Sequence, residues 1–355
     1  MPFWPLYLES LSFSAREIGE LMAIVMATKI IAPNVWGWIA DHTGQRMNIV
    51  RIGSLLSVVF FIGVFIADDY WWLALVMGVF SFFWNATLPQ FEANTFIHLG
   101  NNTHHYSSIR LWGSIGFVVA ATAIGAMLGE SDASLIPIAL ITMFIAIAVM
   151  SFIVPERAAA HMPLDEESIF SVIRKPEVAS LIWVVLLMQA SHGPYYTLYS
   201  LYLEDHGYSK LIIGGLWSLG VIAEVVVFIF IHRLIPAWGL RALLIFSLAI
   251  AVLRWVLLGH FVDSLSILIL IQLGHGATFG VFHAVAIQYF HHYFKGRHQG
   301  RGQAIYSSMS FGAGGAIGAL LAGYTWEFGP VVTFYLAAGF ALIAIIISSR
   351  FIRSL

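Results

Sequence analysis

The chain has 355 residues, of which 59% are hydrophobic and only 10% are charged, and its formal net charge is −2. A soluble domain carries roughly 25% charged residues, so a water-soluble globular protein is excluded and the expected solvent is a lipid bilayer. The small negative charge argues against nucleic acid as a partner. The absence of cysteine excludes disulfides and thiolate metal sites. We expect no cofactor and no metal.

Apolar segments long enough to span a bilayer follow one another along the chain. We expect a partial helix 1 at Pro2–Leu11, followed by spans at Ala15–Ala40, Met47–Ala67, Trp71–His98, Ser107–Gly129 and Ala133–Val154. Six more are expected at Val178–Leu203, Ser209–Arg233, Leu240–Phe261, Ser264–Tyr293, Gly302–Tyr324 and Val331–Phe351. The pattern predicts an all-α integral membrane protein with nominally twelve helices. A polar linker at residues 155–176 would join an N-terminal bundle, residues 1–154, to a C-terminal bundle, residues 177–355.

Two segments of the chain repeat in the same direction at an offset of 195. Tyr7–Met22 reads YLESLSFSAREIGELM and Tyr202–Trp217 reads YLEDHGYSKLIIGGLW. Such a repeat is typical of transporters built from two similar halves, here two six-helix repeats. The helix before Tyr202 starts near Val178, so its counterpart would start before Met1, and we expect helix 1 to be truncated in this sequence. A non-transporting remnant or a membrane sensor is the alternative that this truncation raises.

Lysine and arginine are distributed unevenly between the two sides of the predicted membrane. One side, which includes the linker and the C-terminus, carries 13 of the 17, among them Arg110 near the start of its span. Arg16 and Lys210 lie on the other side, and Lys29 and Arg254 fall inside spans. Because positive loops stay inside the cell, the first side is predicted to be cytoplasmic. We expect a monomeric, multi-pass protein of a bacterial inner membrane with a cytoplasmic C-terminus.

The loop between the second and third spans reads Gly37-Trp-Ile-Ala-Asp41-His-Thr-Gly44-Gln-Arg46. This run resembles the G-x-x-x-D-x-x-G-x-R loop of the major facilitator superfamily. The resemblance implies a cytoplasmic gate, in which Asp41 caps a neighbouring helix and Arg46 holds the cytoplasmic face shut. A generic polar turn is the alternative. The equivalent loop of the second half, Arg233–Arg241, has no acid.

The fourth and fifth spans carry a charged pair. The run Asn85-Ala-Thr-Leu-Pro-Gln-Phe-Glu92-Ala, followed by Arg110-Leu-Trp-Gly-Ser-Ile-Gly-Phe117, resembles sugar–proton symporters of the lactose permease type. The resemblance implies that Glu92 and Arg110 bind substrate and that Phe117 is an aromatic platform. Asn85 shares a helical face with Glu92. A structural salt bridge is the alternative, although charges inside a membrane are costly and usually functional.

The second half carries Glu224, Arg254 and His275 inside predicted spans. The runs Leu253–Trp255 and Gln272–His283 resemble the phenylpropionate-type permeases of the major facilitator superfamily, and so does essentially the whole chain. An arginine within a membrane needs a partner, and we expect Glu224 or the carboxylate of the substrate. Glu224 and His275 are the candidates for proton coupling, and Arg254 and His275 are also candidates for binding the substrate. Alternatively, His275 could simply be hydrogen-bonded to a neighbouring helix. Thr278 stands where the sugar symporters have a proton-carrying glutamate, so the sugar site is not reproduced.

Two further residues stand out within the spans. Lys29 in the second span could pair with an acid or bind an anionic substrate. His192, beside Gly193-Pro194, marks a place where the seventh span could be broken.

These observations together predict a secondary active transporter that carries a small aromatic carboxylate with protons by alternating access. A nucleoside or sugar proton symporter is the alternative, because Asn85 and Glu92 could bind hydroxyl groups. An enzyme is not expected, since the chain has no H-E-x-x-H and no G-x-S-x-G motif.

Overall fold

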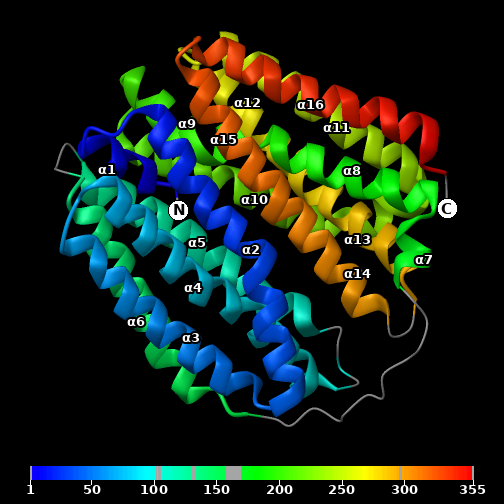
Figure 1. The fold of residues 1–355 in the computed structure, drawn as a ribbon. Helices are drawn as coiled ribbons and strands as arrows, with labels where there is room; N and C mark the ends of the chain where they lie inside the picture. Colours follow the sequence, from blue (N-terminus) through cyan, green and yellow to red (C-terminus); the bar gives the residue numbers. More distant parts are fainter. Residues whose placement is uncertain are drawn as a thin grey trace.

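The computed structural model describes residues 2–100, 102, 105–129, 133–156, 169–295 and 298–353. Within these ranges every regular element is a helix, and the helices form two bundles (Figure 1). Ten helical segments of the described ranges are long and apolar enough to cross a membrane. The predicted all-α membrane fold is therefore confirmed. Most of the predicted linker, residues 157–168, lies outside the described residues, as do Arg157 and Arg297 of the charge distribution.

The helices of the first bundle begin and end close to the predicted positions. They are α1 (Trp4–Ser10), α2 (Ala15–Thr43), α3 (Arg46–Phe61) with its continuation η1 (Ile62–Phe65), α4 (Tyr70–Leu99), α5 (Tyr106–Leu128) and α6 (Leu135–Ile153). The second bundle follows the short helix α7 (Ile169–Ile173). Its helices are α8 (Pro176–Ser191), α9 (Gly193–Asp205), α10 (Lys210–Trp238), α11 (Leu240–His260), α12 (Leu265–His275), η3 (Gly276–Val281), α13 (Phe282–Tyr293), α14 (His298–Ser307), η4 (Ser308–Gly314), α15 (Gly315–Trp326) and α16 (Pro330–Phe351).

The repeat seen in the sequence extends over whole helices. Helices α2 and α10 are both 29 residues long, and their ends lie 195 positions apart. Each begins after a serine, Ser14 or Ser209, whose hydroxyl accepts a backbone N–H of the first turn. Each ends before a glycine with positive φ, Gly44 at 68° or Gly239 at 74°. Serine is a favoured N-cap and glycine adopts this backbone without strain, so the same local signals end both helices.

Three of the predicted spans are interrupted. The seventh span is broken at His192, between α8 and α9, as Gly193-Pro194 suggested. The tenth and eleventh spans each contain a π-helical segment, η3 and η4, between two α-helices. Such segments are rare and often occur at functional sites. The second bundle therefore has irregular backbone in three of its spans.

The two bundles meet most closely at one end, which we call the closed end. A Cβ added to Gly19 of α2 would lie 2.7 Å from Gly323 Cα in α15, and one on Gly214 of α10 would lie 2.5 Å from the Ala121 carbonyl oxygen in α5. We call the opposite end, where α6 ends and α8 begins, the linker end. Toward the linker end, α2 and α14 diverge (Figure 1). Small residues thus permit backbone contact at the closed end, while the halves splay apart at the linker end.

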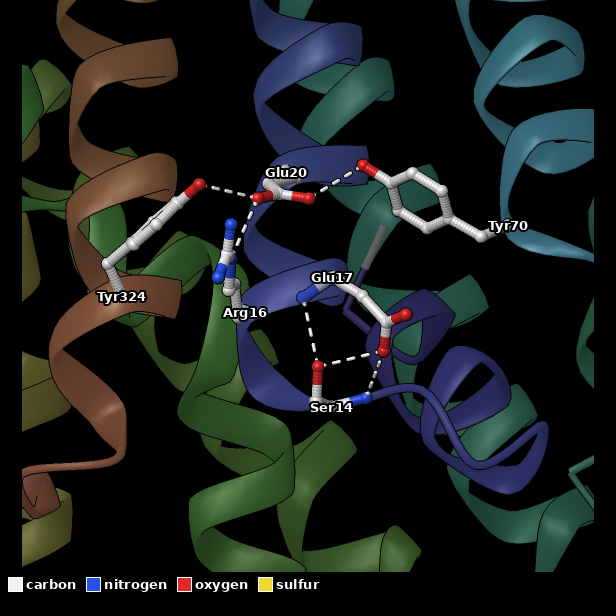
Figure 2. A network of polar contacts seen from close by, with 6 residues as sticks. All are labelled: Ser14, Arg16, Glu17, Glu20, Tyr70 and Tyr324. Carbon is white, nitrogen blue, oxygen red and sulfur yellow. Dashed lines mark hydrogen bonds and ion pairs between the residues drawn. The ribbon is translucent and has the colours of Figure 1, made fainter.

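A polar network crosses between the bundles at the closed end (Figure 2). Glu20 of α2 accepts hydrogen bonds from the hydroxyls of Tyr70 in α4 and Tyr324 in α15, both at 2.7 Å. Arg16 donates to Glu20 at 3.1 Å, and its guanidinium carbon lies 4.5 Å from the centre of the Tyr324 ring. Tyr324 is the member of this network that belongs to the second bundle. The network therefore ties the two halves together at this end.

Candidate substrate and proton site

The predicted gate residues lie together at the linker end of the first bundle. Arg46 Nη2 lies 2.6 Å from Asp41 Oδ1, and Arg46 Nη1 donates to Gln90 Oε1 at 2.7 Å. Glu156, which follows α6, caps the start of α3 by accepting the backbone N–H of Met47 at 2.9 Å. Both partners of Arg46 belong to the first bundle, so in this conformation the pair does not bridge the halves.

Glu92 and Arg110 also meet, as their positions predicted. Arg110 Nε lies 3.5 Å from Glu92 Oε1, and the side chains are 53% and 34% exposed, respectively. Arg110 makes no other hydrogen bond or ion pair with the residues that the structure describes. Most donors of its planar guanidinium are therefore available for a ligand, and that group suits a carboxylate because it can bind both oxygens.

Asn85 and Phe117 lie apart from this pair. The Asn85 side chain donates to Thr28 Oγ1 at 2.8 Å and to the Val25 carbonyl at 3.3 Å, so it joins α4 to α2. Asn85 lies about 10 Å along α4 from Glu92. Phe117 is partly buried against the main hydrophobic core. The structure thus brings Glu92 and Arg110 together but not Asn85.

In the second bundle, Glu224 is paired with His275. His275 Nε2 lies 2.9 Å from Glu224 Oε1, and the two side chains are 4% and 15% exposed. The expected pairing of Glu224 with Arg254 is not formed. Arg254 instead donates from Nε to the Ile271 carbonyl at 2.8 Å and from Nη1 to the Thr278 hydroxyl. Of the two partners expected for Arg254, Glu224 or the carboxylate of a substrate, the first is not bound in this conformation, because Arg254 points from α11 toward the irregular segment η3, whose course the sequence does not reveal.

Arg254 is buried against aromatic rings and carries an unused donor. Its guanidinium carbon lies 4.6 Å from the centre of the Trp255 ring and 5.4 Å from that of Tyr195. Its Nη2 is buried without a hydrogen-bond partner among the described residues, and so is His275 Nδ1. Unsatisfied buried donors are rare in folded proteins. Arg254 and His275 can therefore each make a hydrogen bond that they do not make with the described residues.

An aromatic column continues from His275 along η3 and α13. The rings of His275 and Phe279 stack at 5.6 Å, and those of Phe279 and His283 stack at 5.9 Å with an interplanar angle of 4°. Phe311 of η4 packs beside this column, 6.1 Å from Phe279. His283 Nδ1 lies 2.7 Å from the Tyr306 hydroxyl oxygen. His275, Phe279 and His283 therefore share one face of this span, despite the π-helical segment.

Sequence reasoning missed the contacts between distant segments. The bond of Glu20 to Tyr324 joins residues 304 positions apart. The cap that Glu156 provides to α3 also joins two separate parts of the chain. The i,i+4 spacing of Arg16 and Glu20 predicts a salt bridge within α2, but it does not indicate that Tyr324 joins it.

Comparisons with known proteins agree with this architecture. A family model described as the MFS_1 like family matches residues 1–336. The chain is 28% identical to a probable 3-phenylpropionic acid transporter of Escherichia coli (strain K12), covering 100% of this chain and 94% of that protein. It is 25% identical to a maltose permease of Geobacillus stearothermophilus, covering 94% and 86%.

Solved structures show the same fold. The crystal structure of the nucleoside transporter NupG has a TM-score of 0.83 at 16% identity, over 98% of this chain and 94% of that chain. A bacterial homologue of the iron transporter ferroportin in an inward-facing state has a TM-score of 0.71 at 17% identity, over 98% and 93%. The chain belongs to the MFS_1 like family: it is a multi-pass membrane transporter of the major facilitator type, and its relatives are transporters rather than enzymes.

Proposed function

We propose that this member of the MFS_1 like family is a secondary transporter that carries a small aromatic carboxylate, such as 3-phenylpropionate, together with a proton. The observation that carries the proposal is an excess of cations inside the spans. Lys29, Arg110 and Arg254 stand against two carboxylates, Glu92 and Glu224, and these carboxylates pair with Arg110 and His275. A monovalent anion would reduce this excess positive charge, which a membrane interior tolerates poorly.

Aromatic rings beside the Glu224–His275 pair support the proposal, because they suit the hydrocarbon part of such a substrate. Phe279 stacks between His275 and His283, and it is only partly buried. Stacked or edge-to-face ring pairs contribute about 0.5–1.5 kcal/mol beyond the burial of area. The proposed substrate therefore binds its ring near Phe279 and its carboxylate to cations. The name of the Escherichia coli relative supports the same class of substrate.

The Glu224–His275 pair is the proposed site of proton coupling. Symport requires a membrane-embedded group whose proton affinity depends on the bound substrate. The pair is buried, and it lies one turn from Phe279 through His275. A substrate anion near this pair changes the local charge, so proton binding and anion binding become linked.

Orientation follows from the distribution of positive residues. The linker end carries the large majority of lysines and arginines, so we place it in the cytoplasm. The conformation would then be open toward the cytoplasm and closed toward the outside. The gate pair Asp41–Arg46 would lie at the cytoplasmic face, where it could reach the second bundle once the halves close there.

The test is uptake into proteoliposomes that contain the purified full chain, with a proton gradient as the driving force. We expect accumulation of radiolabelled 3-phenylpropionate, and inhibition of that uptake by other aryl-alkyl carboxylates but not by uridine or maltose. Accumulation of uridine or maltose with no uptake of the carboxylate would overturn the proposal in favour of a nucleoside or sugar symporter.

A further inference from the structure

We infer that Lys29 of α2 is a second residue of the first bundle, besides Arg110, that binds the carboxylate of the substrate, and that it thereby selects acids over neutral analogues. The inference rests on the proposed function and names a group that contributes to its specificity. Lys29 occupies the middle of α2, which runs from Ala15 to Thr43. It is therefore close to the centre of a span, where a charged side chain costs about 2.5–3.5 kcal/mol.

Lys29 lies on the side of α2 opposite Ile31. Ile31, which is 58% exposed, marks the outer face of α2, and a residue two positions away on a helix lies about 200° around the axis. To one side of Lys29 around the helix axis, Thr28 is hydrogen-bonded to Ser81 of α4 in the first bundle. To the other side, Met26 packs against α15 of the second bundle, where a Cβ added to Gly315 would lie 3.3 Å from Met26 Cγ. Lys29 therefore lies between the face of α2 that contacts its own bundle and the face that contacts the second bundle.

No described residue neutralises Lys29. It makes no hydrogen bond or ion pair within the described ranges, although its side chain is only partly exposed. The other charged groups that lie well inside the spans all have partners: Glu92 with Arg110, Glu224 with His275, and Arg254 with Thr278 and a backbone carbonyl. An intramembrane cation that lacks an internal counter-ion indicates a functional site for an anion.

The same region of α2 contacts η4, the segment that packs beside the aromatic column of the second bundle. Ile30, the next residue, lies against Gly312 of η4, where an added Cβ would be 2.6 Å from the Ile30 side chain. Phe311, the residue before Gly312, packs against both Phe279 and His283. Lys29 and the column thus approach the boundary between the halves from opposite sides. One aryl carboxylate could bind its anionic end to the first bundle and its ring to the second.

The chemistry of this arrangement selects for charge. A lysine ammonium is a compact donor that binds a carboxylate strongly where water is scarce, and a hydrogen bond to a charged group contributes about 1.5–3 kcal/mol. An amide or alcohol of the same size and shape would forgo most of this contribution. The transporter should therefore prefer 3-phenylpropionate to 3-phenylpropionamide, and Lys29 should contribute a measurable part of that preference.

The experiment compares the binding of these two ligands to the purified full chain in lipid nanodiscs. Lys29→Met, which keeps most of the length of the side chain but removes its charge, should weaken binding of the acid by about 10- to 100-fold. Binding of the amide should change less than about twofold. Lys29→Arg, which restores a cation, should recover most of the binding of the acid. Lys175→Met removes a lysine at the start of α8, outside the spans, and controls for net charge.

Each outcome separates this inference from the proposed function. If Lys29→Met binds the acid as tightly as the wild type, or if it loses both ligands alike, the inference is wrong and the proposed function stands. If the wild-type protein binds neither the acid nor the amide but does bind a nucleoside, the proposed function fails first. Retained binding of the amide by Lys29→Met also shows that this variant is folded.

Discussion

At the scale of single residues, the intramembrane carboxylates of Glu92 and Glu224 each already contact a basic side chain. Glu92 contacts Arg110 through one nitrogen at 3.5 Å, and Glu224 contacts His275 at 2.9 Å. The first pair is half-exposed and the second is buried, so the two pairs suit different roles. Exposed ion pairs contribute little to stability, so a ligand could replace Glu92 as the partner of Arg110 at little cost to the fold. The buried pair is the better place to hold a proton in the membrane.

The Glu92–Arg110 pair is tested by Arg110→Lys. Lysine keeps the charge but loses the planar guanidinium that binds both carboxylate oxygens. We expect the affinity for 3-phenylpropionate to fall by at least about tenfold, while the yield of folded protein in the membrane stays the same. Equilibrium binding in nanodiscs measures this change, and Arg233→Lys at the linker end of α10 is the matched control. Unchanged affinity in Arg110→Lys would reduce the pair to a structural salt bridge.

Proton coupling at the second pair is tested by Glu224→Gln. Glutamine keeps the shape and can still contact His275, but it cannot release a proton. The variant should exchange substrate across the membrane in a counterflow assay, because exchange needs no net proton movement. It should not accumulate substrate against a gradient. Accumulation at the wild-type level would move the coupling site elsewhere, with His275 the next residue to change.

Sequence reasoning predicted contacts between neighbouring spans better than contacts shaped by irregular backbone. Glu92 and Arg110 could be paired because they lie near the facing ends of consecutive helices. The partner of Glu224 could not be predicted, because Arg254 and His275 were both available and the π-helical segment η3 decides between them. The partner of Lys29 was likewise left open, because only the folded structure shows that Glu92 and Glu224 are paired with other residues.

At the scale of helices, the closed end depends on glycines and on polar contacts between the halves, the Glu20 network among them. Gly214 of α10 allows its helix to touch the backbone of α5 at Ala121, and the Tyr324–Glu20 bond joins α15 to α2. These contacts must separate if the protein is to open at this end. Their strength therefore sets the balance between the two conformations of an alternating-access cycle.

The Gly214 contact is tested by Gly214→Ala with Gly215→Ala as its control. The added methyl at position 214 meets a carbonyl oxygen at 2.5 Å, whereas nothing lies within 4 Å of the same group at position 215. Overpacking of this kind costs about 1–3 kcal/mol, so Gly214→Ala should open the closed end. The chain has no cysteine, so a Met22→Cys probe, buried at this end, can report opening by maleimide labelling. Equal labelling in both variants would show that the contact does not control the gate.

The polar network is tested by Tyr324→Phe. Tyr324 is 43% exposed, so the lost hydrogen bond to Glu20 should favour opening by only about 1 kcal/mol, or roughly fivefold in population. The same cysteine probe measures the change. Tyr335→Phe is the control, because the Tyr335 hydroxyl bonds to His260 within the second bundle. A smaller effect for Tyr324→Phe than for Tyr335→Phe would rule out a role of this network in joining the halves.

At the scale of the whole molecule, two related bundles hold cations and aromatic rings on either side of their boundary. The first bundle contributes Lys29 and the Glu92–Arg110 pair, and the second contributes the His275 column with its proposed proton-binding pair. The repeat at an offset of 195 makes the halves alike in backbone, for example in α2 and α10. Their side chains differ. In the proposed mechanism the first bundle binds the anion and the second bundle binds the proton.

The most direct test of this account is the movement of protons with substrate in proteoliposomes. A downhill pulse of 3-phenylpropionate at a pH well above the pKa of the free acid should carry protons into the vesicles, seen as alkalinisation outside. Protein-free vesicles correct for passive entry of the acid, and 3-phenylpropionamide should give no signal. We expect proton uptake that depends on the carboxylate and is lost in Glu224→Gln. Uptake of the carboxylate without proton movement, or proton movement driven by a nucleoside instead, would contradict it.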